Sequence, residues 1–404
     1  MRIVGLITEY NPFHNGHQHH IEKALEITQA DVAIVVMSGN FVQRGTPAIM
    51  PKHLRVEMAL KSGAALILEL PSCYATGSAE YFAYGAVSLL DKLGCVDSIC
   101  FGSECGDIEV LKNLAKIIHT EPTEYKNYLN SYLKMGNTFP LARQLALKAY
   151  LKTDAFNKIL SEPNNILGIE YLKALYKLNS KMKPYSIKRE TSSYHDDVLR
   201  EKFSSASAIR NELLKEDWDF AELYGQIPTV CMPLIKDLYK RRYPICENDF
   251  SLLLKYKLLK ETKTSLTKYA DVSEDLANRI VNRLNEFCDF NQFCQLLKTK
   301  EMTYTRISRA LIHILLDIRV DDCQDIEYAR ILGFRKDKDF VLSLMKLYAS
   351  IPLITKLGNK EQLSNAGKMM LEQDIYVSNL YESVVADKFK TTYETEYMKQ
   401  IVIV

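Results

Sequence analysis

The chain has 404 residues, of which 47% are hydrophobic and 25% charged, so it can form a large packed core and is not disordered overall. Its 52 lysines and arginines are balanced by 50 aspartates and glutamates, which excludes a polycationic nucleic-acid-binding protein but not a local basic face. No apolar run is long enough to span a bilayer, and nine scattered cysteines are typical of reduced thiols. The length predicts roughly two or three domains, and we expect a soluble, cytoplasmic protein.

Short apolar runs alternate with helical patterns in the first quarter of the chain. The predicted strands span residues 2–7, 31–37, 64–70 and 96–101, and the predicted helices between them span residues 16–28, 51–61 and 78–93. Uniformly apolar short strands separated by helices are typical of a parallel sheet covered on both faces. Such sheets bind ligands beyond the carboxyl ends of their strands, so the loops after the first, second and fourth strands are the first candidates for a site.

The pattern changes along the rest of the chain. Residues 107–178 are mostly helical in pattern, a further strand is predicted at 184–188, and a serine-rich segment then leads into a helix. Beyond about residue 226 the strand patterns stop, and short amphipathic helices follow, with one last strand suggested at 399–404. We therefore predict a Rossmann-like α/β region at 1–226, followed by a mainly α-helical region at 227–404.

The strongest local motif follows the first strand. His14 and His17, with Gly16 between them, open a helix, and a spacing of three puts both imidazoles on the same side of its first turn. Gly16 lets a ligand approach the backbone closely, and the free N–H groups of a helix start bind anions. The motif predicts a triphosphate site in which His14 and His17 are catalytic, stabilising the charge on a departing pyrophosphate.

The same loop contains four histidines, His14, His17, His19 and His20, which raises the alternative of a zinc site. No cysteine or carboxylate pattern with ligand spacing accompanies them, so we expect no protein-bound metal. On this interpretation His19 and His20 pack on the helix or lie on its surface.

A second candidate anion site is the segment 203–210, in which serines begin a helix that contains Arg210. Serine hydroxyls and the free N–H groups of the helix start suit phosphate, and Arg210 adds a cation. The alternative is that the serines only cap the helix. Capping is also the simpler interpretation of Asn164 and Asn165, which precede a helical run.

The chain resembles the tRNA(Met) cytidine acetate ligase family of the HIGH-type nucleotidyltransferase superfamily. The resemblance rests on four segments that together span most of the first ~210 residues: Glu9–His17 (EYNPFHNGH), Met37–Gly45, Pro163–Gly168 and Ser204–Arg210. It implies that ATP, accompanied by Mg²⁺, reacts with acetate to form acetyl-adenylate. The acetyl group would then pass to N4 of the wobble cytidine of elongator tRNA(Met), giving N4-acetylcytidine.

The resemblance also implies an ATP-binding catalytic domain at 1–226 and a tRNA-binding helical domain at 227–404. The implied ATP-binding residues lie mostly in the first loop, with others after later strands and in the serine segment: Ile7, Thr8, Glu9, Tyr10, Asn11, Pro12, Phe13, Asn15, Gly16, Gln18, His19, His20, Gly102, Asn164, Asn165, Arg189, Ser204, Ser207 and Arg210. Gly102 either simply ends a strand or contacts the nucleotide through its backbone, and the place of the strand end near the predicted adenosine site favours contact. Arg189 follows a strand, where it is either a surface charge or a phosphate or nucleotide contact.

Two further groups are candidates for the other substrates. Ser38, Asn40 and Arg44 follow the second strand, where they would hold acetate or RNA or simply form a structural loop. Residues 232–320 contain 16 Lys and Arg against 11 Asp and Glu, and Lys240, Arg241 and Arg242 are the densest basic cluster for tRNA. The rival functions are a nucleotidyltransferase or acetate ligase acting on a small metabolite or carrier thiol, and a non-catalytic RNA-binding protein.

Overall fold

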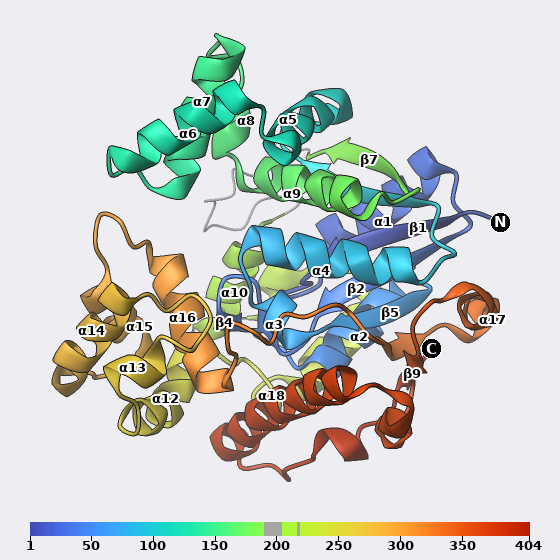
Figure 1. The fold of residues 1–404 in the computed structure, drawn as a ribbon. Helices are drawn as coiled ribbons and strands as arrows, with labels where there is room; N and C mark the ends of the chain where they lie inside the picture. The colour runs from blue at the N-terminus through green and yellow to red at the C-terminus, as the bar shows by residue number, and fades with distance from the viewer. Residues whose placement is uncertain (190–203, 216–218) are drawn as a thin grey trace.

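The computed structural model describes residues 1–189, 204–215 and 219–404, and its centre is an eight-stranded sheet (Figure 1). The strand order is β10-β8-β5-β2-β1-β6-β7, with β9 paired to β8. Five strands run parallel to their neighbours along the series β5-β2-β1-β6-β7: β1 (Ile3–Thr8), β2 (Val32–Ser38), β5 (Leu66–Leu70), β6 (Ser98–Ser103) and β7 (Lys183–Lys188). They lie where the apolar runs predict them, and the α/β fold class is confirmed.

The order of these parallel strands locates a crevice. From β1 the chain proceeds to β2 and β5 on one side and later to β6 and β7 on the other, so the order reverses at β1. Connections leaving a sheet at such a point diverge, which opens a space at the carboxyl ends of the strands. The loops after β1 and β6 therefore border that space.

The sheet is covered on both faces because successive side chains of each strand point in opposite directions. Ile34 packs into one apolar cluster with α4 (Ala79–Lys92), α5 (Ile108–Thr120) and α9 (Pro163–Leu178). Its neighbour Val35 packs into another with α1 (Asn15–Thr28) and α2 (Lys52–Lys61). Burial on both sides explains why the strands are uniformly apolar.

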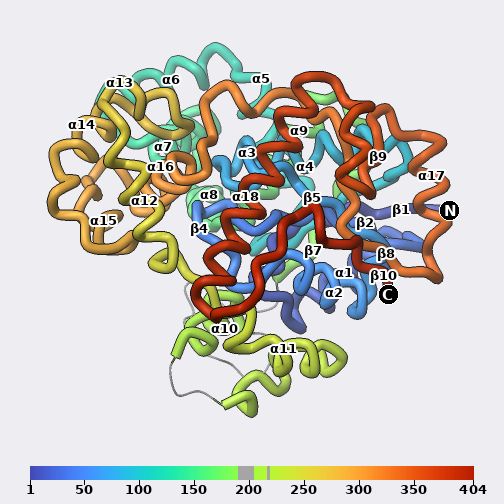
Figure 2. The backbone as a smooth tube through the Cα atoms, turned by 90° about the horizontal axis from the view of Figure 1, so that it is seen from below, coloured from blue at the N-terminus to red at the C-terminus, as the bar shows by residue number. Residues whose placement is uncertain are grey.

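The remaining helices form groups around this core (Figures 1 and 2). In chain order they are α3 (Ser72–Ala75), α6 (Thr123–Lys134), α7 (Phe139–Leu151), α8 (Asn157–Ser161), α10 (Ala206–Leu214), α11 (Met232–Leu238), α12 (Ser251–Leu258), α13 (Lys263–Leu266), α14 (Glu274–Arg283), α15 (Phe290–Leu297), α16 (Tyr304–Leu316), α17 (Phe340–Tyr348) and α18 (Asn365–Phe389). Among the described residues, none of the helices combines the length and hydropathy needed to cross a bilayer.

The expectation that strands stop near residue 226 is wrong. β8 (Ala329–Phe334) pairs antiparallel with β5, and β9 (Leu353–Ile354) and β10 (Val402–Ile403) pair with β8. Arg330 and Gly333 interrupt the apolar pattern of β8, so the sequence of β8 does not show the uniformly apolar pattern of the earlier strands. β10 falls within the last strand suggested at 399–404. The division into domains at residues 226 and 227 stays a prediction, and the sheet crosses it.

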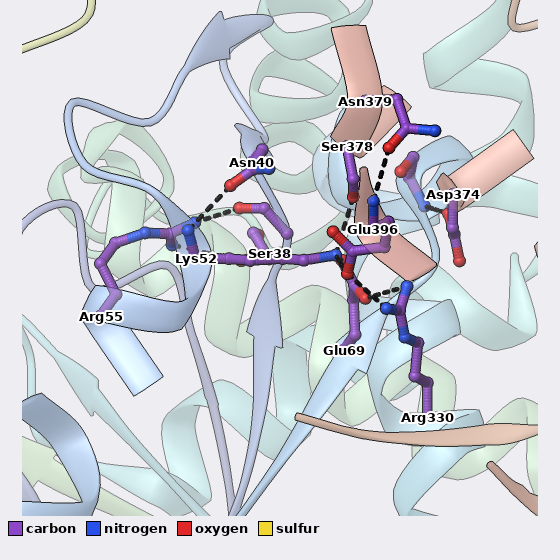
Figure 3. A network of polar contacts seen from close by, with 12 residues as sticks. Ser38, Asn40, Lys52, Arg55, Glu69, Arg330, Asp374, Ser378, Asn379 and Glu396 are labelled. Carbon is purple, nitrogen blue, oxygen red and sulfur yellow. Dashed lines mark hydrogen bonds and ion pairs between the residues drawn. The ribbon is translucent and has the colours of Figure 1, made fainter. Parts of the chain in front are cut away.

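A buried ionic cluster, defined here as Lys52, Glu69, Arg330 and Glu396, ties these late strands to the early ones (Figure 3). The ammonium of Lys52 lies 2.7 Å from Glu69 and 2.8 Å from Glu396, and Arg330 pairs with both carboxylates. Burial alone would raise the pKa of Glu396, but the charges of Lys52 and Arg330 hold it at about 2. Two cations and two carboxylates thus balance inside the protein.

Candidate active site

A cavity of about 300 Å³ opens at the carboxyl ends of β1, β6 and β7. Most of the residues predicted for ATP line it, together with Arg44. The predicted residues in its lining are Ile7, Thr8, Glu9, Tyr10, Asn11, His14, Gly16, His17, His19, His20, Arg44, Gly102, Asn164, Arg189, Ser204, Ser207 and Arg210. The topological crevice is thus a single cavity into which loops from four parts of the chain converge.

The start of α1 fixes the two catalytic candidates in defined orientations. Nδ1 of His14 accepts a hydrogen bond from the N–H of Gly16 at 3.1 Å, and Nδ1 of His17 accepts one from the N–H of His14 at 3.3 Å. The two rings are stacked, with centroids 3.7 Å apart. Because Nδ1 is the acceptor in each ring, a neutral imidazole must carry its proton on Nε2. Each histidine therefore has an Nε2–H free to act as a donor.

Both histidines are neutral around pH 7. Burial, together with the charges of Arg189 and Arg210, lowers the pKa of His14 to about 3. Burial, followed by the proximity of His14, lowers the pKa of His17 well below its usual value. Burial and Arg189 likewise lower the pKa of His20 to about 4. The histidines thus contribute hydrogen-bond donors, and the arginines contribute the positive charge.

Packing and hydrogen bonds hold the loop that carries the histidines in place. Tyr10, with a φ of +48°, is fully buried and packs edge-on against Phe13, with ring centroids 4.7 Å apart. The carbonyl of Asn11 accepts a hydrogen bond from Arg210 at 2.7 Å, and its side-chain oxygen accepts one from the N–H of Ile49 at 2.8 Å. These contacts hold the loop in the shape that presents α1 to the cavity.

Five residues predicted for ATP do not line the cavity: Pro12, Phe13, Asn15, Gln18 and Asn165. Phe13 is fully buried beneath the loop, and the side chain of Asn15 donates to the carbonyl of Gly225 at 2.7 Å. The side chain of Gln18 donates to Glu22 on the same helix. The residues of this set on the histidine loop support or flank the loop. A sequence motif cannot distinguish such support from contact with a ligand.

The opposite wall comes from β6, β7 and the start of α9. Gly102 leaves room for Arg189, because a Cβ at Gly102 would lie 3.3 Å from Cγ of Arg189. Asn164 lines the cavity and donates to Glu104 at 2.6 Å. Asn165 is fully buried and accepts from the N–H of Cys105 at 3.1 Å. Of the two predicted asparagines, only Asn164 faces the cavity, and Asn165 has a structural position.

The start of α10 forms a third wall. Ser205 caps the helix by accepting from the N–H of Ala208 at 3.0 Å, so the capping interpretation holds for this serine. Ser204 and Ser207 line the cavity, and Arg210 donates to the hydroxyl of Ser207 at 3.1 Å. Phe203, also part of the predicted segment, lies outside the described residues.

The residues predicted after β2 have two different positions. Arg44 lines the cavity from the hairpin of β3 (Phe41–Val42) and β4 (Thr46–Pro47), together with Gln43. Ser38 is fully buried, and the side chain of Asn40 accepts from the N–H of Lys52 at 2.8 Å (Figure 3). Ser38 and Asn40 therefore belong to the packed base of this loop, and only Arg44 is placed for a substrate.

The basic cluster proposed for tRNA follows α11. Arg242 is engaged with Glu382 at 2.5 Å, whereas Arg241 is exposed and paired with Asp237 of α11 at 3.0 Å. Lys240 is exposed as well. Arg242 is thus occupied in holding α18, and Lys240 and Arg241 remain the candidates. Within residues 1–189, 204–215 and 219–404, no group of three or more His, Cys, Asp or Glu side chains is placed to hold a metal ion.

A family model described as HIGH nucleotidyl transferase matches residues 1–396. A curated tRNA(Met) cytidine acetate ligase of Clostridium acetobutylicum is 46% identical over 375 residues, covering 89% of this chain and 91% of that protein. The chain belongs to the tRNA(Met) cytidine acetate ligase family. Another relative of that name, from Clostridium novyi, is 41% identical and covers 97% of this chain and 99% of its own.

Solved structures agree with this family assignment over the full length. The crystal structure of Thermotoga maritima TmcAL without ligand superposes with a TM-score of 0.94 at 31% identity, with 100% of both chains covered. The structure of the same protein bound to alpha-thio ATP has a TM-score of 0.92 at 30% identity and the same coverage. The late strands β8 to β10 are therefore included in the match.

The cavity of this tRNA(Met) cytidine acetate ligase family member also has an apolar wall that the sequence did not predict. Phe82, Phe101, Leu167 and Tyr171 line it from α4, β6 and α9. Phe101 and Tyr171 pack against each other, with ring centroids 5.4 Å apart. Such residues have the same pattern as core residues, so no local signal marks them. Only the convergence of α4, β6 and α9 at one edge brings them to the site.

Proposed function

We propose that this protein activates acetate with ATP as acetyl-adenylate and transfers the acetyl group to N4 of the wobble cytidine of elongator tRNA(Met). The observation that carries the proposal is the start of α1, where two neutral histidines with protonated Nε2 atoms stand at the carboxyl edge of a Rossmann-like sheet. Membership of the tRNA(Met) cytidine acetate ligase family supports the choice of acetate and tRNA as substrates.

In the first step an acetate oxygen attacks the α-phosphorus of ATP, and the bond to pyrophosphate breaks. His14 and His17 would donate from Nε2 to the phosphate oxygens on which charge accumulates. Arg189 and Arg210 supply positive charge beside these histidines. Mg²⁺ would enter with ATP and would neutralise part of the charge of its phosphates. No protein nucleophile is needed, since positioning and charge stabilisation dominate phosphoryl chemistry.

In the second step N4 of the cytidine attacks the acetyl carbonyl, and AMP leaves with the electron pair of the broken anhydride bond. A cytidine in an anticodon loop is single-stranded and can be turned out of its stack into a pocket. In this arrangement we place the adenosine of ATP against the apolar wall and the triphosphate of ATP against the starts of α1 and α10. Lys240 and Arg241 would contact the phosphates of the tRNA elsewhere on its surface.

The half-reactions provide the test. Acetate-dependent exchange of labelled pyrophosphate into ATP, in the absence of tRNA, is expected if acetyl-adenylate forms in this cavity. AMP release that then depends on elongator tRNA(Met) would separate the proposal from a carrier-thiol or metabolite ligase. Folded protein that binds ATP but shows no acetate-dependent exchange would contradict the proposal and favour a non-catalytic RNA-binding protein.

A further inference from the structure

One carboxylate stands out in a cavity that is otherwise suited to anions. Among the described lining residues, Glu9 is the one Asp or Glu, whereas Arg44, Lys188, Arg189 and Arg210 are all cations. A carboxylate repels the phosphates that the other side chains attract, so it does not serve the triphosphate. Its chemistry suits a partner that donates N–H groups.

The carboxylate of Glu9 is anchored at one oxygen. Oε1 accepts a hydrogen bond from the N–H of Gln43 at 3.0 Å, and the carbonyl of Glu9 accepts one from the buried guanidinium of Arg55 at 2.6 Å. The residue is therefore fixed at both its backbone and its side chain, which is the support that a reacting group requires.

The charges around Glu9 differ from those around the histidines. The charges that bear on His14 are those of Arg189 and Arg210, from the β7 and α10 walls. The charge of Glu9 bears on Arg44 of the hairpin and on Tyr171 of the apolar wall, and the charge of Arg210 bears on Arg44 as well. Glu9 thus stands at the hairpin end of the cavity, where its carboxylate accepts a hydrogen bond from the N–H of Gln43, and the charge of Arg210 reaches both this end and His14.

The hairpin end faces the helical part of the chain. The hydroxyl of Ser308 on α16 donates to the carbonyl of Gly45 at 2.7 Å. Gly45 has a φ of +68°, and a Cβ there would lie 2.4 Å from Cα of Arg309. The tip that carries Gln43 and Arg44 is therefore packed directly against α16. A macromolecule held by the helical part would reach the cavity from this end.

We propose that Glu9 is the catalytic residue that accepts the proton of the cytidine amino group during acetyl transfer, an inference that rests on the proposed function. The lone pair of N4 is delocalised into the ring, so the amine is a weak nucleophile until it loses a proton. As the N4–C bond forms and the anhydride C–O bond breaks, AMP takes the electron pair. The N4 proton passes to the carboxylate of Glu9 and then to solvent. A carboxylate that accepts from N4–H also selects cytosine.

The test supplies synthetic acetyl-AMP and elongator tRNA(Met) to excess enzyme and measures the single-turnover rate of N4-acetylcytidine formation. Glu9→Gln keeps the oxygen that accepts from Gln43 and removes only the basic charge. It is expected to slow transfer by about 100-fold or more, the usual contribution of a general base, with tRNA affinity within about threefold of wild type. Glu22→Gln, on an exposed turn of α1, is the matched control and is expected to transfer at the wild-type rate.

Two results would overturn the assignment. One is transfer by Glu9→Gln within about threefold of wild type. The other is acetate-dependent pyrophosphate exchange reduced by the same factor as transfer, which would place Glu9 at the nucleotide. Wild-type protein that neither exchanges pyrophosphate nor labels the tRNA would instead refute the proposed function, and with it this inference.

Discussion

The cavity and the buried ionic cluster use charged and polar residues in opposite ways. In the cluster, Lys52 and Arg330 are matched by Glu69 and Glu396, with separations of 2.7 to 2.9 Å for three of the four pairs. In the cavity, described cations outnumber the single carboxylate, and burial suppresses the charge of the histidines. The charges of the buried ionic cluster balance one another and need no further partner. The excess of positive charge in the cavity is instead suited to an anion that the protein itself does not supply.

The comparison separates structural charges from functional ones that look alike in the sequence. Removing a member of the cluster should cost stability, because an uncompensated charge stays buried. Removing a cavity donor should cost activity and leave the fold intact, because the group lost there serves a ligand. The variants below test this separation, from the largest expected effect to the smallest.

Lys52→Met is expected to lower the free energy of unfolding by about 3–5 kcal/mol, because the two carboxylates of Glu69 and Glu396 would remain buried with Arg330 as the one cation of the cluster. Urea denaturation measures the change. Lys390→Met is the control, since its pair with Asp387 is exposed at the end of α18, and it should stay within about 0.5 kcal/mol of wild type. Equal effects of the two substitutions would contradict the structural role of the cluster.

His17→Ala is expected to reduce acetate-dependent pyrophosphate exchange by about 100- to 1,000-fold, the effect of losing one preorganised donor at a developing charge. Its unfolding midpoint should stay close to that of wild type. Gln18→Ala, at the next position but outside the cavity lining, is the matched control and should retain exchange. Retained exchange in folded His17→Ala protein would remove His17 from the catalytic centre.

Gly45→Ala tests the contact between the hairpin and α16. The left-handed backbone and the 2.4 Å approach to Arg309 should together lower the free energy of unfolding by about 1–3 kcal/mol. Gly136→Ala shares the positive φ, at +81°, but has nothing within 4 Å of the added Cβ. The excess loss in Gly45→Ala over Gly136→Ala measures the close packing alone, and no excess would mean that the hairpin moves freely from α16.

The pH dependence of stability follows from the lowered histidine pKa values. Burial lowers the pKa of His14, and that of His53 in the first turn of α2, to about 3, and it lowers the pKa of His20 to about 4, whereas histidines of the unfolded chain have a pKa of about 6.5. Between those values the unfolded chain binds protons that the folded chain does not, so stability is present above pH ~6.5 and falls as the pH decreases. Urea midpoints at about pH 7.5 and 5.5 should show this fall, and His20→Asn should show a smaller one. An identical fall in His20→Asn would contradict the assignment for His20.

Local patterns predicted the parallel strands and the histidine loop because their determinants are adjacent in the chain. An apolar run makes a buried strand, and the spacing of His14 and His17 specifies a helix start. β8 was missed because its charge, Arg330, is neutralised by Glu69, whose position 261 residues earlier no local pattern reveals. The choice between Asn164 and Asn165, and the exclusion of Ser38 and Asn40, likewise depended on contacts with distant residues.

The most direct test incubates the purified protein with ATP, Mg²⁺ and labelled acetate, with and without elongator tRNA(Met), and digests the RNA to nucleosides. We predict label in N4-acetylcytidine that requires ATP, needs no acetyl-CoA and is lost in His17→Ala. Folded wild-type protein that binds ATP but leaves the RNA unlabelled, with no acetate-dependent pyrophosphate release, would contradict the account.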